Sequence, residues 1–440
     1  MSDRLSRFAV LHPIGDLTLV HSTATGASVV LAREVLAELG SGGTVERSTA
    51  SELRRLGIVV PADADERASL LLRFDSAAFS VKSLNPIVCL TGDCNVRCVY
   101  CYEEGAQRGA MEQGTLRATM DWICRNAASG GFEHVHLTLF GGEPLLEMNL
   151  VEELCSTLAE RLTSLKKTIS FYVSTNGTLL TRDVARRLIA VGVRGGQVSV
   201  DGVAKLHDER RPYLTGEGTH DVILRNIVDV ADIFDVCVKV NFDRHSCEHF
   251  EDLLDELEQA GLREIVTMKL EAVAPTRCST DDSSHHCAVH AFDSRGADLA
   301  RTYADLIDAA AKRGFQVSRD TGHSSPCMFT AQHQVAIGQS GDLYKCVSSV
   351  GIPEFIVGSV FDEEYGPRYS SCMAARYVAL SCLDSTDCPY VPICAGGCQY
   401  EAFVTQGRYG KKLCRRQFHE AQIRGLLIMR ARAAGLKVSE

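Results

Sequence analysis

Three cysteines near residue 100 carry the most specific chemical signal in the chain. Cys94, Cys98 and Cys101 are spaced C-x3-C-x2-C in the segment CNVRCVYC. Three thiolates suit a [4Fe–4S] cluster that keeps one of its four irons open to a small molecule. Structural zinc would need a fourth ligand at short spacing, and no Cys or His follows before Cys124. The spacing therefore favours an iron–sulfur site over a zinc site.

A second set of residues suited to binding follows apolar runs further along the chain, in the segments FGGEP, STNGT, SVDG and HDERRP. The set consists of Gly141, Gly142, Glu143, Ser174, Asn176, Ser199, Asp201 and Arg211. Each of these residues alone would be an ordinary cap or turn residue. Together they stand at the ends of successive predicted strands, where a shared ligand would bind.

The elements that must position these residues repeat six times between residues 84 and 275. Strand patterns at 86–91, 134–140, 169–175, 197–200, 236–242 and 265–273 alternate with helical periods. One helical period carries an apolar stripe from Leu150 to Leu165 that can pack on a sheet. Strand–helix–strand order requires parallel pairing through right-handed crossovers. We therefore predict an α/β fold with a partial (β/α)6 barrel, in which the carboxyl ends of the strands carry the chemistry.

Three further regions flank this barrel. Residues 1–80 resemble a small winged-helix-like unit, with a hairpin at FAVLH and LTLVHS, two helices, a short IVV strand and a polar linker, PADADERAS. Residues 276–320 are expected to form a connecting loop and a helix near 297–312. Residues 321–440 are expected to be loop-rich and rich in cysteine, with a basic final helix.

Composition sets the class of protein. The 440 residues are 45% hydrophobic and 23% charged, which is typical of a folded chain of two or three domains. A net charge of −10 disfavours nucleic acid as a partner. No apolar run is long enough to span a bilayer and MSDRLSRF lacks a signal-peptide core, so we expect a cytoplasmic protein without membrane contact. In that compartment 18 cysteines indicate metal or redox chemistry rather than disulfides.

CNVRCVYC resembles the cluster motif of the radical S-adenosylmethionine (SAM) enzymes, and the resemblance continues through the predicted barrel. It implies a [4Fe–4S] cluster on the three cysteines, with SAM chelating the open iron. Reductive cleavage of SAM would then give a 5′-deoxyadenosyl radical that abstracts hydrogen from the substrate. By the same resemblance Tyr100 lies against the adenine, Glu143 and its glycines bind the SAM amino group, and Arg211 neutralises the SAM carboxylate. The remaining members match ribose- and carboxylate-contacting positions: Ser174, Asn176, Ser199 and Asp201.

The cysteines after residue 320 resemble the SPASM extension of radical SAM enzymes that act on peptides, because CPYVPICAGGC matches its C-x5-C-x3-C core. Two auxiliary [4Fe–4S] clusters are implied. One would be held by Cys327, Cys346 and Cys398, and the other by Cys382, Cys388, Cys394 and Cys414.

The extension departs from its family at one position. Ser385 stands where the family usually has a cysteine, and Cys382 is the nearest substitute for it. The fourth ligand of the first cluster is left open between Cys278, Cys287, His323 and an iron that binds substrate directly.

These resemblances imply a radical SAM peptide maturase that forms a cross-link, such as a thioether, in a precursor peptide. The N-terminal unit would hold a leader peptide as an added strand or would simply cap the barrel. An electron donor such as flavodoxin or ferredoxin is the second expected partner. The alternatives are an anaerobic sulfatase-maturing enzyme, a SPASM alcohol or sugar dehydrogenase and, more distantly, a non-catalytic iron–sulfur or zinc protein. Val347 stands where the sulfatase-maturing enzymes have an Asp base, which counts against the first of them.

Overall fold

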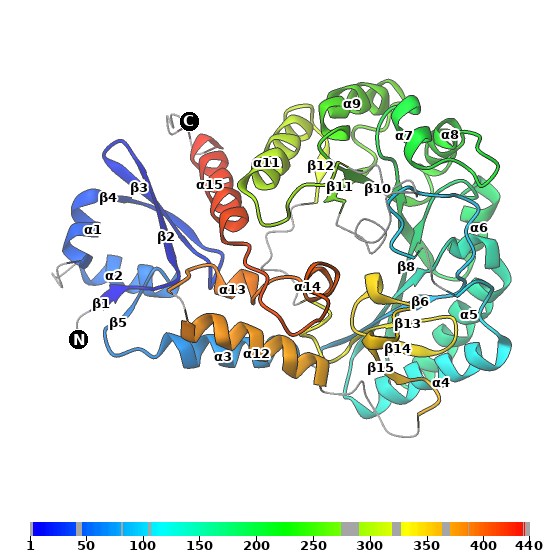
Figure 1. Cartoon of the computed structure of the whole chain (residues 1–440), viewed down its shortest axis with the longest axis horizontal. Coiled ribbons are helices and arrows are strands. Elements are labelled where there is room, and N and C mark those ends of the chain that lie inside the picture. Colours follow the sequence, from blue (N-terminus) through cyan, green and yellow to red (C-terminus); the bar gives the residue numbers. More distant parts are fainter. Residues whose placement is uncertain are drawn as a thin grey trace.

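The computed structural model describes residues 3–40, 46–80, 82–103, 107–273, 290–318, 327–362, 370–385, 387–433 and 435. A curved sheet with helices on its outer face occupies one end of the molecule, and the N-terminal unit occupies the other (Figure 1). Helices α13 (Val391–Cys394), α14 (Gln399–Gln406) and α15 (Arg416–Ala433) lie between them. Within the described residues, no helix is both long and apolar enough to cross a membrane.

Six consecutive parallel strands form the centre of the sheet, as the alternating pattern predicts. They are β6 (Ser83–Cys89), β7 (His134–Phe140), β8 (Thr168–Thr175), β9 (Val193–Ser199), β10 (Asp235–Phe242) and β11 (Thr267–Ala272). Each strand pairs with the next along the chain, and β12 (Gln316–Val317) extends the sheet beyond β11. The carboxyl ends of all six strands therefore meet at one edge, which is where the predicted binding residues stand.

Helices follow the strands and cover the outer face of the sheet. They are α4 (Gln113–Ser129), α5 (Met148–Ser164), α6 (Arg182–Ala190), α7 (Ala204–Arg210), α8 (His220–Val230), α9 (Phe250–Gln259) and α11 (Ala297–Lys312). The apolar stripe of α5 is buried from Leu150 to Leu162. Its predicted last member, Leu165, is wrong: this residue follows the helix as its C-cap and is 40% exposed.

The C-terminal region is more regular than the sequence pattern indicates, and it joins the barrel sheet. Strand β13 (Gln334–Ile337) pairs parallel with β6, and β14 (Asp342–Tyr344) and β15 (Ile356–Ser359) continue the sheet antiparallel. The helix α12 (Ser370–Ser385) follows. The sequence pattern does not predict these strands, because short strands of three or four residues give little periodic signal.

The N-terminal unit contains the predicted hairpin, formed by β2 (Ala9–Ile14) and β3 (Leu17–Ser22). A third strand, β4 (Ser28–Ala32), pairs with β3, and β1 (Asp3–Leu5) pairs with β5 (Val59–Pro61). The two predicted helices are α1 (Arg33–Gly40) and α2 (Arg47–Arg55). The predicted linker PADADERAS is wrong in its second half, because the Asp65 carboxylate caps α3 (Glu66–Ala78) by accepting a hydrogen bond from Ala68 N at 2.9 Å.

The N-terminal unit packs against the C-terminal cysteine region. Phe8 and Leu70 share a buried apolar cluster with Cys382 and Leu383. Arg67 pairs with Asp384 at 2.7 Å, and the Thr23 hydroxyl donates a hydrogen bond to the backbone oxygen of the residue after Cys388. The two ends of the chain therefore form one interface beside the barrel.

Candidate functional site

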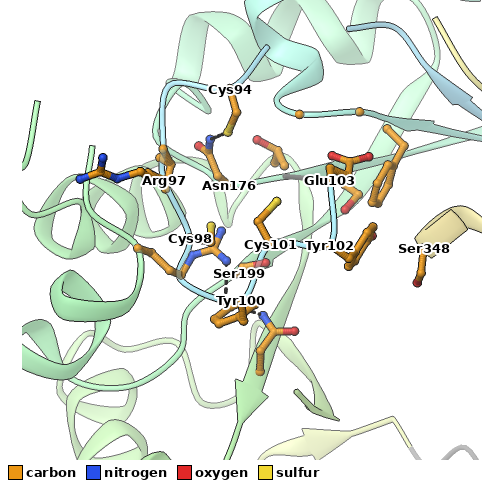
Figure 2. Close-up of a pocket in the computed structure, with 18 of the residues that line it drawn as sticks. Cys94, Arg97, Cys98, Tyr100, Cys101, Tyr102, Glu103, Asn176, Ser199 and Ser348 are labelled. Carbon is orange, nitrogen blue, oxygen red and sulfur yellow. Dashed lines mark hydrogen bonds between the residues drawn. The ribbon is translucent and has the colours of Figure 1, made fainter. Parts of the chain in front are cut away.

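The three motif cysteines lie on the loop after β6 and line a cavity of about 270 Å³ (Figure 2). Val99 N donates to Arg210 O at 3.0 Å, and Arg97 N donates to the backbone oxygen of the residue after Arg211 at 2.9 Å. These bonds attach the cysteine loop to the end of α7 and the residues that follow it. Burial raises the pKa of the Cys94 thiol to about 11 and that of Cys101 to about 12, so bare thiols at this site would be protonated at neutral pH.

The glycines of FGGEP allow the end of β7 to pack directly on the cysteine loop. Gly141 has a φ of +129°, and a side chain there would place its Cβ 2.3 Å from Thr91 O. A Cβ on Gly142 would lie 2.2 Å from Asp93 O. Both glycines line the cavity, and Gly142 N donates to Thr91 O at 2.9 Å.

Glu143 is fully buried and joins the ends of β7 and β8. Its carboxylate accepts hydrogen bonds from Asn176 N at 2.7 Å, Thr175 Oγ1 at 2.8 Å and Leu145 N at 3.0 Å. Burial raises the pKa of Glu143, and the three donors offset only part of that effect. Its side chain is not among those that line the cavity. Contact between this carboxylate and a SAM amino group stays a prediction, and in this structure its oxygens already have partners.

Three polar side chains from the ends of β8 and β9 line the same cavity: Ser174, Asn176 and Ser199. Asn176 Nδ2 lies 3.6 Å from Cys94 Sγ and donates to Asn95 Oδ1 at 2.9 Å. Ser174 Oγ accepts a hydrogen bond from Gln197 Nε2 at 2.8 Å. The structure thus brings the predicted polar residues to the cavity that the cysteines line.

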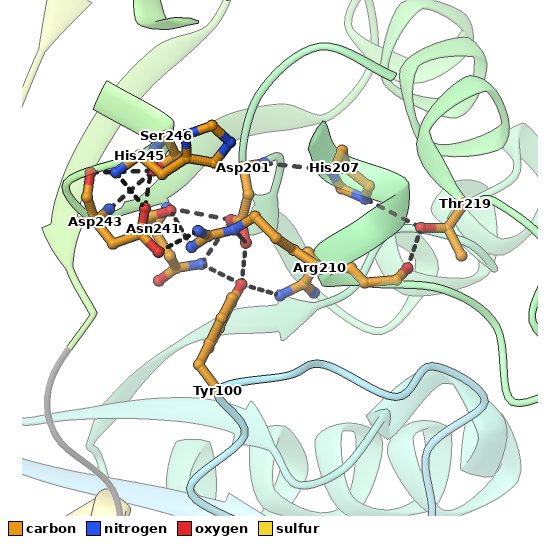
Figure 3. A network of polar contacts seen from close by, with 10 residues as sticks. Tyr100, Asp201, His207, Arg210, Thr219, Asn241, Asp243, His245 and Ser246 are labelled. Carbon is orange, nitrogen blue, oxygen red and sulfur yellow. Dashed lines mark hydrogen bonds and ion pairs between the residues drawn. The ribbon is translucent and has the colours of Figure 1, made fainter. Parts of the chain in front are cut away.

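Tyr100 and Asp201 form the centre of a polar network beside the cavity (Figure 3). The Tyr100 hydroxyl donates to Asp201 and accepts hydrogen bonds from Arg211 Nη1 at 2.7 Å and Asn241 Nδ2 at 3.2 Å. Burial raises the pKa of Asp201, but Arg211 and Arg210 lower it further, so its pKa lies below the ordinary value. Asp201 is 1% exposed and acts from behind the cavity wall, whereas Tyr100, Arg211 and Asn241 line it.

His207 supports this network from α7. Its Nδ1 accepts a hydrogen bond from Asp201 N at 3.2 Å, and its Nε2 lies 3.0 Å from Thr219 Oγ1. Burial and then Arg211 lower the pKa of His207 to about 3, so the ring is neutral and can accept from the backbone. The segment HDERRP contains both His207 and Arg211. The sequence alone does not show that His207 supports the network while Arg211 lines the cavity.

Several residues of the cavity wall carry no motif in the sequence. Tyr102 follows the last cysteine, Ser348 follows Cys346 by two residues, and Tyr400 follows Cys398 by two. Lys239 and Glu271 project from β10 and β11, and their side chains pair at 3.0 Å. A charged residue at alternate positions of an otherwise apolar strand is the signal that marks this pair.

The C-terminal cysteines form two groups. Cys327, Cys346 and Cys398 are close enough to affect one another electrostatically, and burial with these neighbours raises the pKa of Cys346 to about 12. Cys346 and Cys398 pack against an aromatic cluster that includes Phe355.

The second group comes from α12, α13 and the loops around them. Cys382, Cys388, Cys394 and Cys414 line one cavity of about 130 Å³, together with Lys412 and Arg415. No three described His, Cys, Asp or Glu side chains converge as ligands of a single metal ion do. The other proposed ligands, Cys278, Cys287 and His323, lie outside the described residues.

Comparison with known proteins gives the same picture for the barrel. Residues 88–257 match the family model described as the Radical SAM superfamily. The mycofactocin maturase MftC of Mycolicibacterium smegmatis is 23% identical over 348 residues, which cover 74% of this chain and 81% of that protein. A probable GTP 3′,8-cyclase of Methanothermobacter thermautotrophicus is 26% identical over 48% of this chain. The chain spans 65% of that cyclase and 43% of an uncharacterized protein of Methanocaldococcus jannaschii.

Two solved structures share the fold. The enzyme anSMEcpe with bound AdoMet is 16% identical, with a TM-score of 0.66 over 80% of this chain and 99% of that one. SuiB of Streptococcus suis, bound to the precursor peptide SuiA, is 14% identical, with a TM-score of 0.56 over 94% of this chain and 98% of that one. Both likenesses confirm the partial radical SAM barrel as the fold. Residues 88–257 therefore resemble a radical SAM domain in sequence and fold, and that family uses a [4Fe–4S] cluster and SAM.

Proposed function

We propose that the protein is a radical SAM peptide maturase that forms a cross-link, such as a thioether, in a precursor peptide. One observation carries the proposal. The cavity that Cys94, Cys98 and Cys101 line is completed by Ser348 and Tyr400, each two residues from a cysteine of the first C-terminal group. Radical generation and an electron acceptor would thus border one substrate space.

The residues at the barrel edge fit the cofactors. Three thiols of one loop reach the cavity, and the cluster they would hold supplies the electron that cleaves SAM. Arg211 Nε is buried without a hydrogen-bond partner among the described residues, although its Nη1 is bonded to Tyr100. A buried guanidinium with an unmet donor suits the carboxylate of SAM. Tyr100 would orient that guanidinium, and Asn176 and Ser199 would offer polar contacts to the ribose.

The two C-terminal groups fit auxiliary clusters. Four thiols surround the second cavity, and the adjacent Lys412 and Arg415 offset the negative charge that thiolate ligands bring. In this proposal Cys382 takes the place that Ser385 leaves. The first group supplies Cys327, Cys346 and Cys398, and its fourth ligand is not assigned.

The N-terminal unit offers an edge strand for a leader peptide. Strands β2 and β4 are the two edges of its three-stranded sheet. Pro13 in β2 lacks the N–H that an added strand would need, so β4 is the better edge. The likeness to peptide-bound SuiB covers 94% of this chain, which supports a peptide as the substrate. Flavodoxin or ferredoxin would supply the electron.

Two other activities are less favoured. A radical SAM domain is catalytic, which argues against a non-catalytic iron–sulfur or zinc protein. A sulfatase-maturing reaction needs a base after Cys346, but Val347 packs with the apolar residues around Phe355.

Anaerobic incubation with SAM and dithionite tests the proposal. We expect 5′-deoxyadenosine from the reconstituted protein, none from Cys98→Ala, and about twelve irons per chain for three clusters. Co-production with any short cysteine-containing peptide that is encoded beside its gene should give a peptide lighter by two hydrogens. The absence of 5′-deoxyadenosine would refute the radical SAM activity, whereas unchanged peptides would refute only the maturase assignment.

A further inference from the structure

A pair of opposite charges, Lys239 and Glu271, lies on the cavity wall. Lys239 Nζ lies 3.0 Å from Glu271 Oε2, and Lys269 Nζ lies 3.6 Å from the same oxygen. Neighbouring side chains on these strands, such as Val238 and Leu270, are buried against the helices. Alternation along the strands therefore directs Lys239, Lys269 and Glu271 into the barrel.

The strand register places this pair next to the polar network of Tyr100. Asn241 and Glu271 are paired residues of β10 and β11, and Lys239 stands two residues before Asn241 on the same face. Asn241 Nδ2 donates to the Tyr100 hydroxyl at 3.2 Å. Glu271 is thus the lateral neighbour of a residue that contacts the expected adenine-binding tyrosine, and its carboxylate borders the same cavity.

The environment of Glu271 suits a proton acceptor. Both side chains line the cavity, and 49% of the Glu271 side-chain surface is exposed, whereas Lys239 is 18% exposed. Burial raises the pKa of Glu271, and Lys239 and Lys269 together lower it further. The balance keeps the carboxylate ionised at neutral pH, with a free face toward the substrate space.

We propose that Glu271 is the catalytic base of the cross-linking reaction and that Lys239 positions it. The inference rests on the proposed function. Thioether formation breaks one C–H and one S–H bond of the peptide and makes one C–S bond. The hydrogen atom of the C–H bond would leave to the 5′-deoxyadenosyl radical, and the thiol proton would pass to Glu271. A cluster held by the C-terminal cysteines would supply the acceptor for the one remaining electron. The peptide loses two hydrogens in total, so atoms and electrons balance.

A second carboxylate in the cavity, Glu103, is the competing candidate. It lies two residues after Cys101 on the loop that would hold the cluster, and it forms no ion pair with another described residue. Glu271 differs in having a lysine that fixes its carboxylate at a defined place. If Glu271 is the base, Glu271→Gln should lose the cross-linking reaction. If Glu103 is the base, Glu103→Gln should lose it instead.

The experiment measures the ratio of cross-linked peptide formed to 5′-deoxyadenosine formed. The probe is the peptide that the wild-type protein modifies on co-production. For Glu271→Gln we expect the ratio to fall by about a hundredfold or more, which is the usual contribution of a general base. Glu271→Asp keeps the charge and should retain a measurable part of the product. Glu264→Gln is the matched control, since this residue lies just before β11 with an 81% exposed side chain, and its ratio should equal that of the wild type.

Each outcome decides between the assignments. An unchanged ratio in Glu271→Gln, or a loss confined to Glu103→Gln, overturns the inference and leaves the maturase proposal standing. A wild-type protein that makes no 5′-deoxyadenosine or no cross-link removes the proposed function, and the inference falls with it. Circular dichroism of Glu271→Gln separates a lost base from a lost fold.

Discussion

The barrel and the C-terminal cysteine region, which both contribute residues to the cavity of the three motif cysteines, are built in different ways. On the barrel side, hydrogen bonds among the residues themselves fix the site: Glu143 accepts three, and Asp201 is held by Tyr100, Asn241 and the arginines. On the C-terminal side, the cysteines stand on short elements such as the four-residue α13 and among several small apolar clusters. Hydrogen bonds of the chain itself therefore hold the barrel side, whereas the proposed clusters would cross-link the C-terminal side.

Removal of iron should give the largest difference between the two regions. We expect anaerobic chelation to raise amide hydrogen exchange in residues 387–414 by about a hundredfold, because the proposed cluster there would contribute its binding free energy to folding. Exchange in β7 and β8 should change little, since their core is continuous with the buried residues of α4 and α5. Hydrogen-exchange mass spectrometry measures both. Equal protection of both regions after chelation would contradict the comparison.

The two C-terminal groups should also differ from each other. Cys388→Ser removes a proposed ligand of the group that packs on the N-terminal unit, where Arg67 meets Asp384 and Phe8 meets Leu383. We expect exchange in β2 and β3 to rise by about tenfold, which corresponds to about 1.4 kcal/mol of docking free energy. Cys327→Ser is the matched control, because the first group packs on the barrel side and should leave the N-terminal unit unchanged. A similar rise in both variants would show that cluster loss acts globally.

The sequence predicts the barrel side of the site better than the C-terminal side. The six strands, their order and the polar residues at their ends follow from alternation and spacing, because parallel strands deliver their carboxyl ends to one edge. Lys239 and Glu271 were not predicted, because their alternation with apolar residues shows only that they face the barrel interior and does not indicate a ligand. Strands β13 to β15 were missed because three or four residues set no period, although they attach the C-terminal region to the barrel. The position of Cys382 beside Cys388, Cys394 and Cys414 depends on the packing of α12, which no local pattern encodes.

The barrel wall can be weakened without touching a cysteine. Glu143→Gln replaces an acceptor of three hydrogen bonds by an amide whose NH₂ group must face at least one donor. We expect the free energy of unfolding to fall by about 2–3 kcal/mol, the cost of leaving a buried donor unsatisfied. Chemical denaturation measures it. Glu160→Gln on the exposed face of α5 is the control and should change the stability by less than about 0.5 kcal/mol.

The smallest expected effect comes from a variant that tests whether the Tyr100 network serves SAM binding or only the stability of the barrel edge. Tyr100→Phe keeps the ring against the cavity but removes the hydroxyl that Arg211 and Asn241 donate to and that donates to Asp201. If this hydroxyl orients Arg211 for the SAM carboxylate, the Kd for SAM of the iron-loaded protein should rise by about tenfold, or about 1.4 kcal/mol. Iron content should stay the same, because no thiol is changed. Tyr377→Phe, at a 72% exposed position of α12, should bind SAM as the wild type does. An unchanged Kd in Tyr100→Phe, with a lower stability, would mean that the network holds the barrel edge together and takes no part in cofactor binding.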